Sequence, residues 1–161
     1  MGNYLKLSNR YLLEYLVNGN KGIIKYSDLK KYYEYATKDD CEYINANICD
    51  DKIVICFTVA QGQGGVVAVW DTESKKFTHV SDGEYAVTAT IYKNKIYILE
   101  NVSNFVEKSH SLISCVEYGI IDSAVESNFI QNIDDSIDLN SDVVFEVKND
   151  GILINDVIID I

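Results

Sequence analysis

Short runs of apolar and β-branched residues, separated by Gly, Asn and Asp, recur along the whole chain. Such runs, bounded by turn-forming residues, predict β-strands. A strand that is buried on one face alternates apolar and polar positions. Residues 53–57 do not alternate, because all five are apolar. The pattern therefore predicts an all-β protein in which at least one sheet is covered on both faces, as in antiparallel sheets that stack face to face.

The strand-like runs repeat with a period of about 42 residues. Residues 51–59 are matched by residues 9–17 on one side and by residues 94–99 on the other. A period of this length is typical of repeat architectures built from small β-units. We therefore predict one domain made of repeated four-stranded antiparallel units, with approximate boundaries at 3–40, 42–82, 84–126 and 128–161.

Tight turns are expected near the start of each unit. Proline is absent from the chain, so Gly, Asn and Asp must form the turns. The combinations that hairpins prefer occur at Ser8-Asn9, Asp50-Asp51, Lys93-Asn94 and Asn149-Asp150-Gly151. Each of them predicts the connection between the first two strands of a unit.

Residues 65–80 carry the most specific pattern in the chain. They read as two strands, and Trp70-Asp71 stands at the end of the first of them. This segment resembles the third and fourth strands of a WD-repeat blade, and the period also resembles that family. No Gly-His pair opens a blade, and Ser27-Asp28 and Glu117-Tyr118 replace Trp-Asp in other units. The resemblance is strongest over residues 42–82 and implies a small or partial β-propeller, without implying a function.

A second architecture remains open, namely an irregular β-sandwich or barrel with one or two N-terminal helices. Residues 8–17 could form a helix capped by Ser8, and residues 27–36 could form another. We favour strands for both segments, because the repeat accounts for them together. The last unit is short, so the arc of units could be completed by a second copy that pairs with an unpaired terminal strand.

Acidic residues are concentrated in the last third of the chain. The net charge is −11, and residues 109–161 contribute eleven acids and one base. A field of one sign attracts a cationic partner, whereas nucleic-acid binding needs clustered Lys and Arg. We therefore predict a basic protein partner and no direct contact with nucleic acid. The candidate contact residues are Asp122, Glu126, Asp134, Asp135, Asp138 and Asp142.

No set of residues indicates catalysis or a bound cofactor. His79 and His110 are the only histidines, and neither belongs to a recognisable triad pattern. The Gly-rich residues 61–65 lead into a strand rather than a helix, which argues against a phosphate loop. Residues 138–142 resemble the start of a calcium loop, but Val143 stands where its glycine should be. We predict no enzyme, no cofactor and no metal.

Cysteine usage and hydropathy bear on the compartment. Cys41, Cys49, Cys56 and Cys115 show neither a CxxC motif nor zinc-site spacing, so we expect reduced thiols in the cytoplasm. No run approaches the ~18 apolar residues that indicate a membrane helix. The N-terminal residues lack the charged and apolar regions of a secretory leader, so neither membrane insertion nor export is expected.

Two functions are consistent with these observations. The first is a non-enzymatic interaction module, such as an inhibitor or an immunity-type protein that neutralises a cationic nuclease. Acidic side chains can occupy a phosphate-binding groove and give fast, salt-sensitive association. The alternative is a small-ligand or glycan-binding propeller-like protein that uses residues 61–65 and nearby tyrosines, because Tyr offers apolar area with a polar tip.

Overall fold

The computed structural model describes residues 2–9, 12–33, 41–59, 64–102, 110–134, 143–149 and 151–160. Most of these residues lie in β-strands, which confirms the all-β prediction. The only helical element among them is the short 3-10 helix η1 (Tyr26–Leu29). No helix of the described part is long and apolar enough to cross a membrane.

The strands form four antiparallel sheets, and strands that are adjacent in sequence are neighbours in each sheet. The first sheet contains β1 (Tyr4–Asn9), β2 (Leu12–Val17) and β3 (Asn20–Lys25). The second contains β4 (Cys41–Cys49), β5 (Lys52–Val59), β6 (Gly65–Asp71) and β7 (Lys76–Asp82). The third contains β8 (Ala86–Tyr92), β9 (Lys95–Val102), β10 (His110–Glu117) and β11 (Asn128–Ile133). The fourth contains β12 (Phe145–Lys148), β13 (Gly151–Ile154) and β14 (Val157–Ile159).

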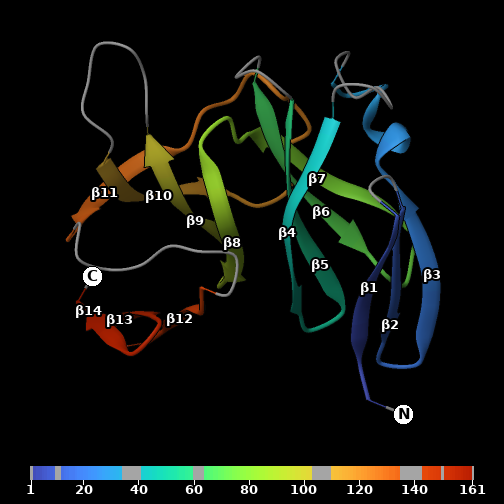
Figure 1. The fold of residues 1–161 in the computed structure, drawn as a ribbon, viewed down its shortest axis with the longest axis horizontal. Helices are drawn as coiled ribbons and strands as arrows, with labels where there is room; N and C mark the ends of the chain where they lie inside the picture. The colour runs from blue at the N-terminus through green and yellow to red at the C-terminus, as the bar shows by residue number, and fades with distance from the viewer. Residues whose placement is uncertain are drawn as a thin grey trace.

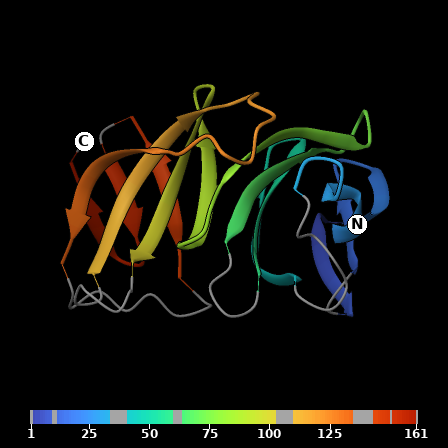
Figure 2. The ribbon, with the colours of Figure 1, turned by 90° about the horizontal axis from the view of Figure 1, so that it is seen from above.

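The chain is thus built from repeated strand units, one sheet for each unit. The third sheet extends beyond residue 126, because β11 pairs with β10. Figures 1 and 2 show the first sheet at one end of the long axis, the second sheet next to it, and the third and fourth sheets together at the other end. None of the sheets formed by the described strands closes on itself.

Three apolar cores lie between successive sheets. The first joins the first and second sheets, the second joins the second and third, and the third joins the third and fourth. In β5, Ile53 and Ile55 belong to the first core, whereas Val54 and Cys56 belong to the second. The continuous apolar run at 53–57 is therefore explained by burial of the second sheet on both faces, as predicted.

Turn chemistry fixes the hairpins. Lys93 and Asn94 both have positive φ (48° and 66°), as the two central residues of a type I′ turn require. Asn18 and Gly19, between β2 and β3, also have positive φ (50° and 84°). The predicted turn at Ser8-Asn9 is wrong, because both residues belong to β1 and Asn9 still pairs with Leu12.

The two N-terminal segments for which the sequence allows either a strand or a helix, residues 8–17 and 27–36, adopt different structures. Residues 12–17 form a strand, as favoured, because alternate side chains pack against the second sheet. A strand at 27–36 is wrong over the described residues, since η1 and a following turn occupy residues 26–32. Leu29, fully buried in the first core, anchors this turn, and the amides of Tyr32 and Tyr33 donate to its carbonyl.

Candidate interaction surface

The segment between β10 and β11 crosses back to the second sheet and follows the edge of β7. The Val80 amide donates to the Ile120 carbonyl (2.7 Å), and the Asp122 amide donates to the Val80 carbonyl (2.9 Å). A parallel bridge joins Val80 to Ile121. This crossing segment, residues 118–127, covers backbone groups that an edge strand would leave unpaired. It also brings acidic side chains of the last third next to those that follow β7.

His79 holds the start of the crossing segment. The side chain is fully buried, and its Nδ1 accepts hydrogen bonds from the amides of Gly119 (3.0 Å) and Ile120 (3.1 Å). Two amide donors at Nδ1 leave the ring proton on Nε2, which lies 2.8 Å from the Ser81 hydroxyl. The ring also stacks on Tyr118. Burial lowers the pKa of His79 to about 4, so the ring is neutral at physiological pH.

Gly83 makes the tight turn after β7. Its amide donates to the Gly65 carbonyl (3.1 Å), and a side chain at this position would place Cβ 2.7 Å from backbone atoms of Val66 and Val67. Only glycine permits this close approach. The turn places Asp82 and Glu84 on either side of Gly83.

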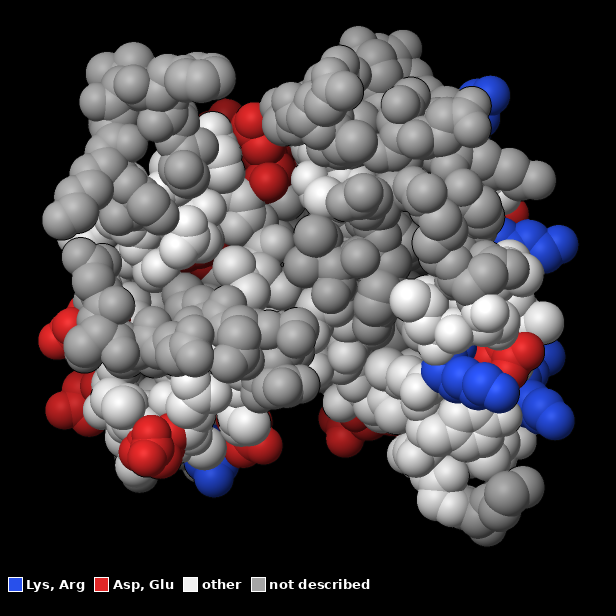
Figure 3. Space-filling view, in the orientation of Figure 1, with Lys and Arg blue, Asp and Glu red and all other residues white. Residues whose placement is uncertain are grey.

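Four carboxylates gather at this junction, and we call them the acidic rim: Asp82, Glu84, Glu100 and Glu126. The Asp82 amide donates to the Val125 carbonyl (2.9 Å), which brings Glu126 alongside. Glu126 is exposed, and the other three are partly exposed. Figure 3 shows acidic atoms gathered between the second and third sheets.

The rim is an uncompensated negative site. Burial, followed by repulsion from Glu84 and Glu126, raises the pKa of Asp82. Burial also raises the pKa of Glu100, opposed by a hydrogen bond from Ser114 and reinforced by Asp82 and Glu126. No described lysine offsets either shift. Like charges held together at partly buried positions destabilise one another, and a cationic group placed among them would relieve this repulsion.

The rim does not have the geometry of a metal centre. No group of three or more His, Cys, Asp or Glu side chains in the described part of the chain is arranged to hold a metal ion. Carboxylates that are close enough to repel one another, yet are not arranged around one ion, suit several separate cationic side chains.

The predicted contact residues fall in different places. Glu126 belongs to the rim. Asp122 is exposed, but its carboxylate also accepts from the Ala124 amide (3.0 Å) and shapes the crossing segment. Asp134 is exposed just after β11. Asp135, Asp138 and Asp142 lie outside the described residues, as do residues 61–63 of the Gly-rich loop.

Three rim residues were missed from the sequence. Asp82, Glu84 and Glu100 belong to the first two thirds of the chain, in which acids and bases nearly balance. A charge count by segment therefore hides them. The available signal was the turn at 82–84, where two acids flank a glycine.

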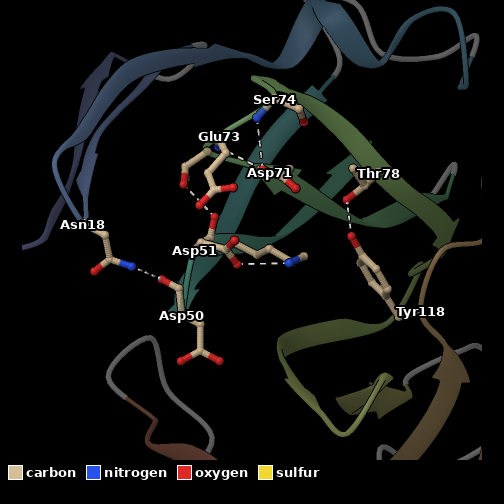
Figure 4. A network of polar contacts seen from close by, with 10 residues as sticks. Asn18, Asp50, Asp51, Asp71, Glu73, Ser74, Thr78 and Tyr118 are labelled. Atoms are coloured by element: carbon tan, nitrogen blue, oxygen red, sulfur yellow. Dashed lines mark hydrogen bonds and ion pairs between the residues drawn. The ribbon is translucent and has the colours of Figure 1, made fainter.

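The opposite end of the second sheet carries a network of structural polar contacts (Figure 4). Asn18 donates to the Asp50 carbonyl (3.3 Å) and links the first two sheets. The Asp71 carboxylate accepts from the amides of Glu73 (2.8 Å) and Ser74 (3.1 Å) and closes the β6–β7 turn. Tyr118 donates to the Thr78 hydroxyl (2.6 Å). These groups hold sheets and turns together.

Comparison with protein-family models, curated proteins and solved structures found no match to the chain. Functional inference therefore rests on the geometry of the molecule itself.

Proposed function

We propose that the protein is a non-enzymatic interaction module whose acidic surface binds a basic protein partner. The observation that carries this proposal is the acidic rim, four carboxylates at one sheet junction, where no lysine among the described residues offsets the raised pKa values of Asp82 and Glu100. An inhibitor or immunity-type role fits this surface, because clustered carboxylates can occupy a groove that otherwise holds phosphates.

The affinity of a partner for the acidic rim should depend on pH and on salt concentration. A cationic side chain beside Asp82 or Glu100 would lower the pKa that burial and repulsion raise. Binding would then release protons wherever these carboxyls are partly protonated in the free protein. Affinity should weaken in acidic buffer and at higher ionic strength.

The test neutralises the exposed side of the rim. We expect Glu84→Gln/Glu126→Gln to weaken binding of a nona-arginine peptide about tenfold, which corresponds to about 1.4 kcal/mol. Isothermal titration calorimetry at 50 mM salt measures this change. Asp50→Asn/Glu73→Gln, which alters exposed residues at the opposite end of the second sheet by the same net charge, is the matched control and should change affinity less than twofold. Equal losses in both variants would show that net charge, rather than the rim, attracts the peptide.

Identification of the natural partner follows from the same pair of variants. A basic protein captured from host lysate by the wild type and the control, released at moderate salt, and absent from the rim variant would support the proposal. A protein retained equally by all three forms would contact another surface.

We infer further that the four sheets are blades of an open, propeller-like arc. Their order along the chain, antiparallel connectivity and face-to-face cores support this inference. Among the exposed apolar side chains, Ile23 (49% exposed) lies on the first sheet and Ile158 (68% exposed) on the fourth. Lys6, Lys21 and Lys25 are exposed on the first sheet, whereas Asp156 and Asp160 are exposed beside the fourth, on which Glu146 pairs with Lys148 (3.8 Å). Two copies that each place the fourth sheet against the first sheet of the other would complement both charge and apolar area and would form a closed dimer.

This arrangement predicts reversible self-association at high protein concentration. We expect sedimentation velocity to show a dimer at low salt that dissociates as salt rises, and Ile158→Lys to abolish it. The matched change Phe129→Lys, at an exposed position on the third sheet, should leave the dimer intact. A wild-type monomer throughout the concentration range would contradict the proposed contact.

A further inference from the structure

A solvent-open pocket of about 600 Å³ lies between the turn that follows the first sheet and the β6–β7 turn of the second. This volume is within the usual range for small-molecule sites, ~300–1,000 Å³. Polar residues Ser27, Asp28, Lys30, Lys31, Lys75 and Lys76 line it together with the aromatic residues Tyr32, Trp70 and Phe77. We call it the lysine pocket. It is separate from the acidic rim, with which it shares no residue.

The charge of the pocket is opposite to that of the protein as a whole. Four lysines and one aspartate line it, whereas the chain has a net charge of −11. The four lysines are exposed, and within the described part of the chain none of them forms an ion pair. Their ammonium groups are therefore available to an anionic ligand. The surrounding negative charge opposes a long polyanion, so the pocket suits a small anion rather than a nucleic-acid strand.

The apolar part of the pocket is already formed. Trp70 and Phe77 are 7% and 5% exposed and meet edge to face, with ring centroids 5.0 Å apart. The Trp70 indole nitrogen donates to the Tyr15 hydroxyl (3.0 Å), which fixes the orientation of the indole ring. A flat ring placed in the pocket would contact the partly exposed Tyr32 and the small exposed edges of Trp70 and Phe77, without requiring these side chains to rearrange.

The lysines of the second sheet are held by a rigid turn. The Lys75 amide donates to the Asp71 carbonyl (2.8 Å), and Lys75 adopts a left-handed conformation (φ 56°). The Asp71 carboxylate binds two further amides of the same turn (Figure 4). Across the pocket, Lys31 lies over the Tyr32 ring, with Nζ 4.9 Å from its centroid. Positive groups therefore flank the aromatic residues from both sheets.

We propose that the lysine pocket binds a small aromatic phosphate of mononucleotide size. The phosphate lies among the ammonium groups of the four lysines, and the flat ring packs against Trp70 and Phe77. A phosphate that carries nearly two negative charges matches the net +3 of the pocket lining better than a single carboxylate does. Asp28 lies on the same lining and offers an acceptor for a hydroxyl or amino group of the ligand.

Trp70 provides the direct readout, because it is the only tryptophan in the chain. We expect adenosine monophosphate, uridine monophosphate or phenyl phosphate to change Trp70 fluorescence saturably, with excitation at 295 nm to avoid ligand absorbance. Adenosine alone and inorganic phosphate alone should bind at least tenfold more weakly than the nucleotide. Absence of a saturable change with all three aromatic phosphates would overturn the proposal.

Two double variants test whether adenosine monophosphate binds in the lysine pocket. Lys30→Gln/Lys75→Gln removes one positive charge from each side and should weaken adenosine monophosphate binding at least tenfold. Lys93→Gln/Lys95→Gln removes the same charge at exposed positions of the β8–β9 turn and should leave affinity within twofold. All four positions are exposed, so both proteins should fold, and circular dichroism checks this. Equal affinity of the two variants would place the ligand elsewhere and contradict the proposal.

Discussion

Acidification from pH 7 to pH 4 is expected to remove up to about 3 kcal/mol of the free energy of unfolding through His79 alone. The imidazole has an ordinary pKa of 6.5, and burial lowers it to about 4 in the folded protein. Each unit of difference corresponds to about 1.4 kcal/mol. The unfolded state therefore binds the proton first, so this contribution is fully present above pH 6.5 and is lost as the pH falls towards 4.

The contacts of His79 explain why its charged form is excluded. Nδ1 is occupied by the amides of Gly119 and Ile120, so protonation there would break both hydrogen bonds. These bonds begin the crossing segment that joins the second and third sheets. Loss of His79 contacts in acid should therefore loosen the same segment that carries Glu126.

The carboxyl groups of the acidic rim change the free energy of unfolding with pH in the opposite direction to His79. The pKa values of Asp82 and Glu100 are raised in the folded state, so their contribution to stability grows as the pH falls. The effect of His79 must therefore be measured as a difference between proteins. We expect His79→Gln, which keeps an acceptor and a donor but cannot become charged, to lose less stability than the wild type between pH 7 and pH 4.5.

Urea unfolding followed by circular dichroism at several pH values measures this difference. His110→Gln, at the second histidine of the chain, is the matched control and should retain the pH dependence of the wild type. If His79→Gln and the wild type lose stability in parallel as the pH falls, the buried neutral imidazole is not the cause.

The sequence predicts the stacked sheets well because their signal is local. Five consecutive apolar residues in β5 can be buried only if both faces of its sheet are covered, and Ile55 and Cys56 do pack on opposite sides. The hairpin turn at Lys93 and Asn94 could also be predicted from the sequence, and both residues adopt the positive φ that such a turn requires. The segment at 27–36 misleads, because its place in the repeat suggests a strand, whereas the described residues form η1 and a turn around the buried Leu29.

The acidic rim and the role of His79 depend on contacts that no local pattern contains. His79 meets Gly119 across 40 residues, and Asp82 meets Val125 across 43. A charge count over residues 109–161 identifies Glu126 but treats the rest of the rim as balanced sequence. The crossing segment along β7 decides which acids become neighbours, and its hydrogen bonds are made by backbone groups that carry no sequence signature.

Tyr15→Ala is expected to give the largest loss of stability, about 3–5 kcal/mol for truncation of a buried aromatic side chain. Tyr15 is fully buried on the inner face of β2, and its ring lies across Gly22 of β3, where any side chain would collide with it. Removing the ring leaves a large void in the first core. It also leaves the buried Trp70 N–H without its acceptor, which costs a further ~1–3 kcal/mol.

The stacked arrangement of the sheets predicts which strands lose stability in Tyr15→Ala. Sheets that contact only their neighbours unfold in part independently. Hydrogen exchange should therefore show loss of protection in β2 and β3 of Tyr15→Ala, while β9 and β10 retain theirs. Tyr15→Phe keeps the ring and removes only the hydroxyl, so it should cost ~1–3 kcal/mol and leave the exchange pattern unchanged. Uniform loss of protection over all four sheets in Tyr15→Ala would show instead that they unfold as a single cooperative unit.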